Sequence, residues 1–339
     1  MYPSYSVIIS PGGPMSNCRY LALLPFLVTS MAFSQPQPGR AGKMQGQKAL
    51  ENGTFHAQLN GARIHYEVHG KGPVLMVLPN AWGINVAPLR TFYRPLESKL
   101  TLVYFDPRGM GASDPVKSDS DMSAATVRRD FDALREHLEL RQVNAIGWSN
   151  GAMNLLLLAS EKPETIAKAV FLHGTASFTE EDNKAMGAAH PEVMKAYQRL
   201  GEELKQKELS DQQKNARLRG VWLNEYVSIA AANPVATRPK VEQLLKDCPL
   251  SWRHFVYSLN EWPKFDARDR LPQISAPSLI LAGAKDSIPL GKAEEMKRGI
   301  RGSKLVVFRN SGHFSPIEEP AAFQNEVLSW LGVGKQDKR

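Results

Sequence analysis

The sequence is poor in cysteine: Cys18 and Cys248 are the two cysteines in 339 residues. Cys18 lies in an N-terminal segment that we expect to be removed, so the mature chain would keep one thiol and form no internal disulfide. Cys248 lacks the neighbours of a metal site, and such a lone cysteine is usually a small buried apolar residue. The chain therefore has to rely on an apolar core for its stability.

The sequence also lacks a basic tract, although its net charge is +8. Its basic residues are scattered along the chain, so no patch is available on which a nucleic acid would bind. With 42% hydrophobic and 22% charged residues, the composition is that of an ordinary globular protein. The length suits one large α/β domain or two smaller ones, and we expect no nucleic-acid partner.

No apolar run is long enough to cross a bilayer comfortably, but one short run stands near the N-terminus. Residues 20–33 form this 14-residue run, with small residues at its end. The layout is typical of a secretory signal peptide, which we predict at residues 1–34. Met15 is an alternative start, and cleavage falls before Gln35 or after Ala32. The mature protein would then be secreted or periplasmic without a stable membrane span; a buried or membrane-anchoring helix is the alternative.

Short apolar segments alternate with helical patterns along most of the chain. Polar and apolar residues alternate in the first two segments, which predicts an antiparallel start to a sheet. The later segments are continuous apolar runs, as expected for strands buried on both faces of a parallel sheet. The predicted strands lie at residues 54–59, 63–70, 74–79, 102–107, 143–148, 167–174, 278–286 and 304–310. Helical patterns at residues 122–140, 151–160 and 318–331 complete an α/β fold with helices on the sheet.

One interval breaks this alternation. Residues 175–262 carry mainly helical patterns and are far longer than a single crossover requires, so we interpret them as a helical cap inserted into the core. The predicted organisation is a polar, flexible leader at 35–51, an α/β core at 52–174 and 263–333, and a polar tail at 334–339.

The stretch GWSNG contains the pattern Gly147-x-Ser149-x-Gly151 between a predicted strand and a predicted helix. A sharp strand-to-helix turn strains the serine backbone, and side chains at the two glycine positions would collide with neighbouring backbone. The strained turn presents the serine hydroxyl at the edge of the sheet. Ser149 is therefore our candidate nucleophile; a serine that merely caps a helix is the alternative.

A serine hydroxyl needs a base, and the base needs an orienting acid. Asp286 and His313 follow the last two predicted strands. Because the carboxyl ends of parallel strands meet at one edge, we expect both to converge on Ser149. Asp106 also ends a strand, but it precedes the serine, so we expect it to pair with Arg108 or to hold its loop.

An attacked carbonyl also needs two backbone N–H donors to stabilise its oxyanion. Asn150, directly after the candidate nucleophile, supplies one. For the second we choose Ala81 in the loop after residues 74–79, with Asn80 and Trp82 as its neighbours.

With these residues assembled, the sequence resembles the α/β-hydrolase family over roughly residues 52–333. The motifs that carry the resemblance are GWSNG, FDPRGMGAS, LAGAKDSIP and NSGHFSPIEEPAAF. The resemblance implies a mostly parallel eight-stranded sheet flanked by helices, a Ser149–Asp286–His313 triad, and no cofactor or metal. Within the family, the chain looks most similar to proline iminopeptidase-like enzymes and small-ester hydrolases. It departs from the usual His-Gly of the oxyanion loop, where it has Pro79-Asn80.

The preferred hypothesis is a secreted serine hydrolase that cleaves a small ester, an amide or a short peptide through an acyl-enzyme. The alternatives are a proline iminopeptidase-like aminopeptidase, a cofactor-free haloperoxidase or perhydrolase in which peroxide replaces water, and a non-enzymatic small-ligand binding protein. Nothing in the sequence indicates the oligomeric state. The candidate pocket residues are Asn80, Trp82, Trp148, His173, Glu225 and Glu261.

Overall fold

The structure is a computed structural model of the 339-residue chain, and it describes residues 49–261 and 265–333. The predicted signal peptide, all but the last three residues of the predicted leader, and the polar tail lie outside these residues. Among the described residues, no helix is both long enough and apolar enough to span a membrane.

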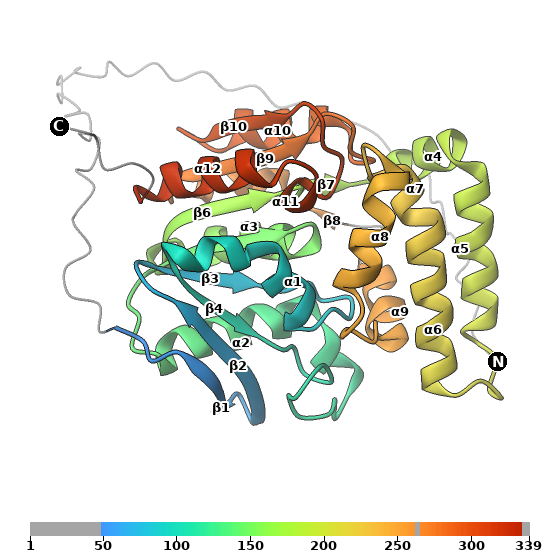
Figure 1. Ribbon diagram of the computed structural model, residues 1–339, viewed down its shortest axis with the longest axis horizontal. Coiled ribbons are helices and arrows are strands. Elements are labelled where there is room, and N and C mark those ends of the chain that lie inside the picture. Colours follow the sequence, from blue (N-terminus) through green and yellow to red (C-terminus); the bar gives the residue numbers. More distant parts are fainter. Residues whose placement is uncertain (1–48, 262–264, 334–339) are drawn as a thin grey trace, which may run out of the picture. The chain divides into compact units, whose positions relative to one another are not determined.

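An eight-stranded, mostly parallel sheet forms the centre of the described residues (Figure 1). Its order is β1-β2-β4-β3-β5-β6-β9-β10. β2 pairs antiparallel with β1 and β4, and every later pairing is parallel. The α/β fold predicted from the apolar runs is therefore correct. The strands are β1 (Gly53–Leu59), β2 (Ala62–Gly70), β3 (Val74–Leu78), β4 (Thr101–Phe105), β5 (Val143–Trp148), β6 (Ile166–Leu172), β9 (Ser278–Gly283) and β10 (Lys304–Phe308).

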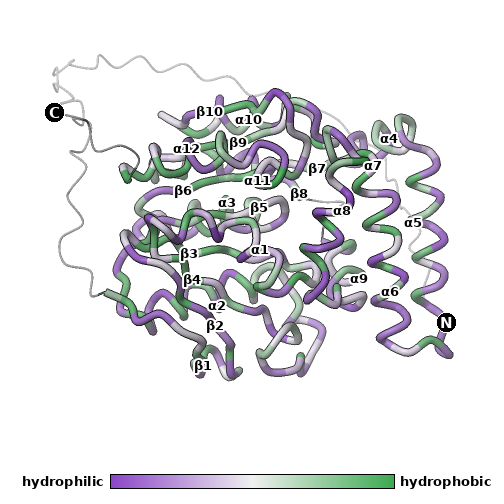
Figure 2. The backbone as a smooth tube through the Cα atoms, in the orientation of Figure 1, coloured by the Kyte–Doolittle hydropathy of each residue, from purple (hydrophilic) through white to green (hydrophobic). Residues whose placement is uncertain are grey.

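Both faces of the sheet are covered, which explains why its central strands are continuously apolar. In β3, Val74, Met76 and Leu78 join one buried cluster, whereas Leu75 and Val77 join the other. The first cluster packs under α2 (Ala124–His137), α3 (Asn150–Glu161) and α10 (Leu290–Gly299); the second packs under α1 (Val86–Tyr93) and α12 (Pro320–Leu331). Figure 2 shows mainly hydrophobic colouring along the central strands and alternating colours on the helices around them.

A helical insertion, residues 180–261, separates β6 from β9 and stands to one side of the sheet in Figure 1. Two short strands, β7 (Ser177–Phe178) and β8 (Phe265–Asp266), pair antiparallel at its base. Its elements are α4 (Glu180–Ala189), α5 (Pro191–Glu203), α6 (Asp211–Val221), the π-helix η4 (Trp222–Tyr226), α7 (Val227–Ala230), α8 (Pro234–Leu244) and α9 (Trp252–Glu261). Cys248, between α8 and α9, is fully buried, and burial raises the pKa of its thiol to about 11.

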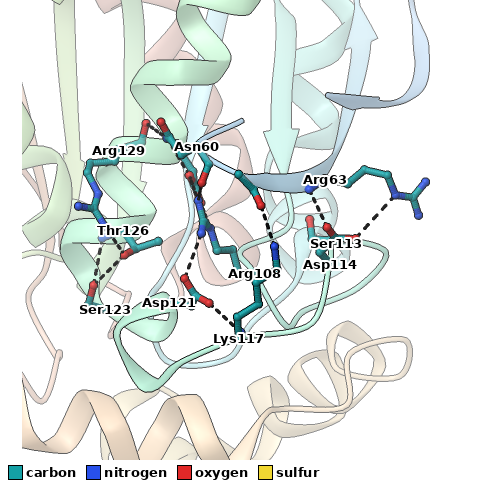
Figure 3. A network of polar contacts seen from close by, with 12 residues as sticks. Asn60, Arg63, Arg108, Ser113, Asp114, Lys117, Asp121, Ser123, Thr126 and Arg129 are labelled. Carbon is teal, nitrogen blue, oxygen red and sulfur yellow. Dashed lines mark hydrogen bonds and ion pairs between the residues drawn. The ribbon is translucent and has the colours of Figure 1, made fainter. Parts of the chain in front are cut away.

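Two residues of the loop after β4, Asp106 and Arg108, hold it through separate sets of contacts. Asp106 accepts hydrogen bonds from the backbone N–H of Val86 and lies 2.7 Å from Nδ1 of His65. Arg108 binds other partners: it donates to Asp130 and Asp121, and to a backbone carbonyl of the β1–β2 turn (Figure 3). The predicted pairing of Asp106 with Arg108 is therefore wrong, whereas the loop-holding role fits the contacts of Asp106.

Candidate active site

Ser149 occupies the sharp turn between β5 and α3. Its backbone has φ 56° and ψ −122°, in a region that L-residues with a side chain rarely adopt. The turn is held by a 2.8 Å hydrogen bond from the Ser149 N–H to the carbonyl of Leu172, at the end of the adjacent strand. Such strain costs about 1–3 kcal/mol and tends to collect at functional sites.

The two glycines beside Ser149 are required by close backbone approach. A Cβ on Gly147 would lie 2.3 Å from the carbonyl oxygen of Gly151, and a Cβ on Gly151 would lie 2.5 Å from the carbonyl oxygen of Leu78. Real Cβ atoms do not approach backbone oxygens this closely. Hydrogen is therefore the side chain that fits at both positions, and the strand-to-helix turn depends on it.

His313 and Asp286 form a buried pair after the last two strands of the sheet. Nδ1 of His313 lies 2.9 and 3.0 Å from the two carboxylate oxygens of Asp286, and the two side chains are 0% and 3% exposed. The other ring nitrogen, Nε2 of His313, is buried and has no hydrogen-bond partner among the described residues. The Trp148 ring, next to Ser149 in the chain, lies 5.3 Å from the His313 ring between centroids. The pair thus lies beside the Ser149 turn with one imidazole nitrogen unengaged.

The surroundings of Asp286 favour its ionised form. Burial alone would raise its pKa, but the charge of His313 and the contacts with His313 and His173 outweigh burial and hold the pKa below its usual range. The backbone N–H of Ile288 adds a 2.9 Å hydrogen bond to Oδ1. A carboxylate held this way fixes the tautomer and orientation of the His313 ring.

His173 lies against Asp286 in the interior of the protein. Its side chain is 0% exposed, its Nδ1 is 2.9 Å from Oδ2 of Asp286, and its Nε2 is 2.8 Å from Oγ of Ser315. Burial lowers the pKa of His173, which favours the neutral ring. The contacts of His173 are with Asp286 and Ser315, so it helps to hold Asp286 in place, and its predicted pocket role stays a prediction.

The same side chains also resemble a metal-binding set. His173, Asp286 and His313 each offer one ligand atom, and these atoms lie within 4.8 Å of one another. The Asp286 oxygens, however, already accept hydrogen bonds from Nδ1 of His313 and from the N–H of Ile288. A hydrogen-bonded pair accounts for these contacts without a metal ion.

The loop after β3 differs from its prediction at Ala81. The Ala81 N–H donates a 2.9 Å hydrogen bond to Oδ1 of Asn150, which also accepts from Nδ2 of Asn154 at 3.3 Å. Ala81 is therefore not free to bind an oxyanion, because its donor is engaged by the side chain that follows Ser149. The next N–H in the turn, that of Trp82, has no acceptor among the described residues.

Three predicted pocket residues belong to the wall around the turn. Asn80 is fully buried, and with its amide oriented to suit both neighbours it donates to the Trp148 carbonyl and accepts from the Trp82 indole. Asn80 therefore braces the loop. Trp148 is also buried, and its indole N–H donates 3.0 Å to the His313 carbonyl. Trp82 is half-buried and faces the insertion, with its ring 5.0 Å from that of Trp222.

The two acidic candidates do not gather at one point. Glu261 is exposed and accepts a 3.3 Å hydrogen bond from the N–H of Ala124, at the start of α2. Glu225 is half-buried in the π-helix, where its charge adds to the effect of burial in raising the pKa of Tyr197. The structure therefore gives no pair of carboxylates from Glu225 and Glu261 that would hold an amino group.

Glu318 has a larger role in the structure than its sequence position indicates. Its Oε2 accepts from the N–H groups of Gly312 (2.8 Å) and Phe314 (3.3 Å), on either side of His313. Its Oε1 accepts from the N–H of Ala232 (2.7 Å) and from Oγ1 of Thr237 (3.2 Å), both in the insertion. One carboxylate thus ties the His313 turn to the insertion. In the sequence, only the presence of Glu318 in the motif NSGHFSPIEEPAAF, five residues after His313, indicates this role.

A separate cavity of about 430 Å³ lies between the loop after β4 and the insertion. Gly109, Met110, Asp211, Trp252 and His254 are among its lining residues, and Ser149, Asp286 and His313 are not. Its polar groups are largely engaged by one another, as in the 2.8 Å bond from the Trp252 indole to Asp211. This cavity therefore does not replace the Ser149 turn as the candidate site.

Comparison with known proteins agrees with the fold. The sequence model described as "alpha/beta hydrolase fold" matches residues 74–320. A pimeloyl-[acyl-carrier protein] methyl ester esterase from Vibrio vulnificus is 24% identical over 276 residues, which cover 79% of this chain and 98% of the esterase. The serine hydrolase BPHL of Mus musculus is 28% identical over 280 residues, covering 80% of this chain and 84% of that protein. The crystal structure of a hydrolase from Pseudomonas aeruginosa superposes with a TM-score of 0.66 at 22% identity, covering 82% of this chain and 98% of that one.

Proposed function

Because the chain belongs to the alpha/beta hydrolase fold family, we propose that it is a serine hydrolase that cleaves a small carboxylic ester, or a related amide, through an acyl-enzyme. The observation that carries this proposal is the strained Ser149 turn beside the buried His313–Asp286 pair, with Nε2 of His313 lacking a hydrogen-bond partner among the described residues. A nucleophile, a base with one nitrogen unengaged and an acid on its other nitrogen are the parts that acyl transfer requires.

In the proposed reaction, Oγ of Ser149 attacks the carbonyl carbon while Nε2 of His313 takes the hydroxyl proton. The tetrahedral intermediate then collapses, the ester C–O bond breaks, and His313 returns the proton to the leaving alcohol. Water, with its proton removed by His313, then attacks the acyl-enzyme; the bond to Oγ of Ser149 breaks, His313 returns the proton to Oγ, and the acid is released. Asp286 orients His313 and stabilises the imidazolium in both halves of the reaction.

We assign the oxyanion donors to the N–H groups of Asn150 and Trp82. Asn150 is the first residue of α3, where an N–H has no acceptor within the helix and the helix dipole favours negative charge. Trp82 replaces the predicted Ala81, since the Ala81 N–H is already bonded to the Asn150 side chain. That bond also supports the new assignment, because it ties the loop to the start of α3.

Aromatic side chains favour a small ester with an apolar body. Trp222 and Tyr226 of the insertion stack on each other at 5.0 Å, and the Tyr226 ring lies 5.9 Å from that of His313. The relative named as a methyl ester esterase supports an ester substrate, and the relative named as a serine hydrolase supports a serine nucleophile. An aminopeptidase is less well supported, because Glu225 and Glu261 form no common site for an amino group. We also propose, from the sequence of residues 1–34 alone, that the protein is secreted or periplasmic.

The test is a comparison of two substrate sets: p-nitrophenyl esters of increasing acyl length, and aminoacyl p-nitroanilides that include proline. We expect hydrolysis of the short esters and at least a 10³-fold loss of kcat in Ser149→Ala, in the order of the losses that follow removal of a triad member. Faster cleavage of prolyl anilide than of every ester would favour the aminopeptidase. Ester hydrolysis that Ser149→Ala leaves unchanged would refute the proposal.

A further inference from the structure

Trp222 carries a buried hydrogen-bond donor without an acceptor. The residue is 1% exposed, and its indole Nε1 has no partner within residues 49–261 and 265–333. Native proteins leave few buried donors in this state, because the donor loses its water and gains nothing in return. Such a group calls for an explanation in terms of a ligand or a strained functional site.

The position of Trp222 distinguishes it from a chance defect in packing. It begins a single π-helical turn, Trp222–Tyr226, in which the N–H of Val227 bonds to the Trp222 carbonyl. Isolated π turns of this kind occur often at functional sites. The turn stacks the Tyr226 ring on Trp222 at 5.0 Å, with 29° between the ring planes, and Tyr226 in turn lies 5.9 Å from His313.

Trp222 also contacts the opposite side of the candidate site. Its ring is 5.0 Å from Trp82, whose N–H we assigned to the oxyanion, and 6.4 Å from Trp148 beside Ser149. The ring that carries the unpartnered donor therefore lies next to Trp82 of the proposed oxyanion loop, and the Tyr226 ring alone separates it from the proposed base. A donor in this position can reach part of a small ester other than its reacting carbonyl.

The nearby charges indicate what kind of acceptor fits. Burial and the charge of Asp286 raise the pKa of Tyr226, and burial and the charge of Glu225 raise the pKa of Tyr197. The charged groups that act on these two tyrosines are therefore acidic. In the described part of the chain, the two lysine contacts with aromatic faces fall on Trp330 and Trp252. A carboxylate bound here would be repelled by these acidic groups, whereas a neutral oxygen would not.

We propose that Trp222 is a substrate-binding residue whose indole N–H donates a hydrogen bond to a second, neutral oxygen of the ester. The inference rests on the proposed function and deepens it. The preferred substrates are small uncharged esters that carry an ether, hydroxyl or further carbonyl oxygen a few atoms from the scissile bond. A site built to bind such an oxygen rejects the analogue that has CH₂ in its place, because the donor is then left unpaired.

Two pairs of nearly isosteric esters test the proposal. One pair places the oxygen in the acyl part: p-nitrophenyl 3-methoxypropanoate against p-nitrophenyl pentanoate. The other places it in the alcohol part: 2-ethoxyethyl acetate against pentyl acetate. After correction for alkaline hydrolysis rates, we expect kcat/KM to favour the oxygen-bearing ester by about 10-fold in at least one pair. In Trp222→Phe, which keeps a ring but removes the donor, that preference should fall below about threefold.

Trp330→Phe is the matched control, because the Trp330 indole also lacks a partner but lies on α12; its preference should equal that of the wild type. A second measurement avoids dependence on the folding of Trp222→Phe: the indole ¹H–¹⁵N spectrum of the Ser149→Ala protein, which contains six tryptophans. One indole proton should move downfield with the oxygen-bearing ester relative to its carbon analogue. Equal kcat/KM values within both pairs, a preference that survives in Trp222→Phe, or no differential shift would overturn the role of Trp222. Hydrolysis of the all-carbon esters by both proteins would show that the proposed function still stands.

Discussion

Replacing Glu318 by Gln tests whether the structure holds His313 in place through its neighbours. Glu318 contacts neither Ser149 nor the His313 ring. Its carboxylate instead accepts two N–H groups of the His313 turn through one oxygen, and two donors of the insertion through the other. A glutamine has one oxygen, so it can satisfy one of these pairs while its NH₂ group faces the donors of the other.

The size of the effect follows from the bonds that are lost. A hydrogen bond to a charged group contributes about 1.5–3 kcal/mol. Glu318→Gln removes two such bonds and sets donor against donor, so holding the native loop geometry would cost roughly 3–6 kcal/mol. Because this energy is large, we expect the loop to shift instead of keeping its native geometry, and His313 would move with it. A shift of about 1 Å at a reacting group lowers the rate about 100-fold. We therefore expect kcat to fall about 30- to 100-fold, with KM changed by less than about threefold, since uniform substrate binding is not altered.

The assay is steady-state hydrolysis of a short p-nitrophenyl ester, with thermal unfolding measured on the same samples. Glu326→Gln is the control, because Glu326 lies on the same C-terminal segment and makes a surface ion pair with Lys304. That exposed pair contributes about 0–1 kcal/mol, so kcat should stay near the wild-type value. A Glu318→Gln variant with the kcat of Glu326→Gln would refute the positioning role, whatever its melting temperature.

Three further predictions concern the turn, the loop and the fold. Gly147→Ala places a Cβ 2.3 Å from a backbone oxygen, so it should reduce kcat/KM for a short ester by more than about 100-fold. The control Gly291→Ala, whose added Cβ meets no other atom within 4 Å, should leave ester hydrolysis unchanged. Equal activities of the two variants would contradict the requirement for glycine at position 147. Asn150→Ala removes the acceptor of the Ala81 N–H and loosens the loop after β3, so kcat measured by stopped flow should fall about 10-fold. An unchanged kcat would show that the bond between Ala81 and Asn150 does not hold the loop for catalysis. The hydrogen bond with the Asp106 carboxylate raises the pKa of His65, so the protonated form of His65 stabilises the fold. This contribution is fully present below pH about 6.5 and is lost as pH rises through the raised pKa. Urea unfolding should therefore show a larger deficit for His65→Gln at pH 6 than at pH 9; the reverse order would be contrary to this sign.

The fold could be predicted because its signals are local. Strands covered on both faces give unbroken apolar runs in the sequence, and β3 to β6 and β10 lie within two residues of their predicted positions. β9 begins where it was predicted and ends three residues earlier. The short helix α1 and the helix α10 were missed. The turn residues on either side of α1 hide its apolar periodicity, and α10 buries only two side chains, Ala293 and Met296.

The candidate site could be predicted in outline but not in its contacts. Strand ends meet at one edge of a parallel sheet, which is why chain order alone brings Asp286 and His313 together. The engagement of Ala81 depends on the rotamer of Asn150, and the enclosure of His173 depends on how Ser315 packs across the sheet edge. Both features depend on tertiary packing, which leaves no periodic pattern in the sequence. The buried donor of Trp222 is likewise visible only when its surroundings are known.

The most direct test of the central claim is intact-mass analysis after reaction with a fluorophosphonate, followed by peptide mapping. We predict a single adduct per folded chain, on Ser149, and none in Ser149→Ala. His313→Ala should react far more slowly, because its base is absent. An unlabelled wild-type protein, or an adduct that persists in Ser149→Ala, would contradict the claim that Ser149 is the nucleophile.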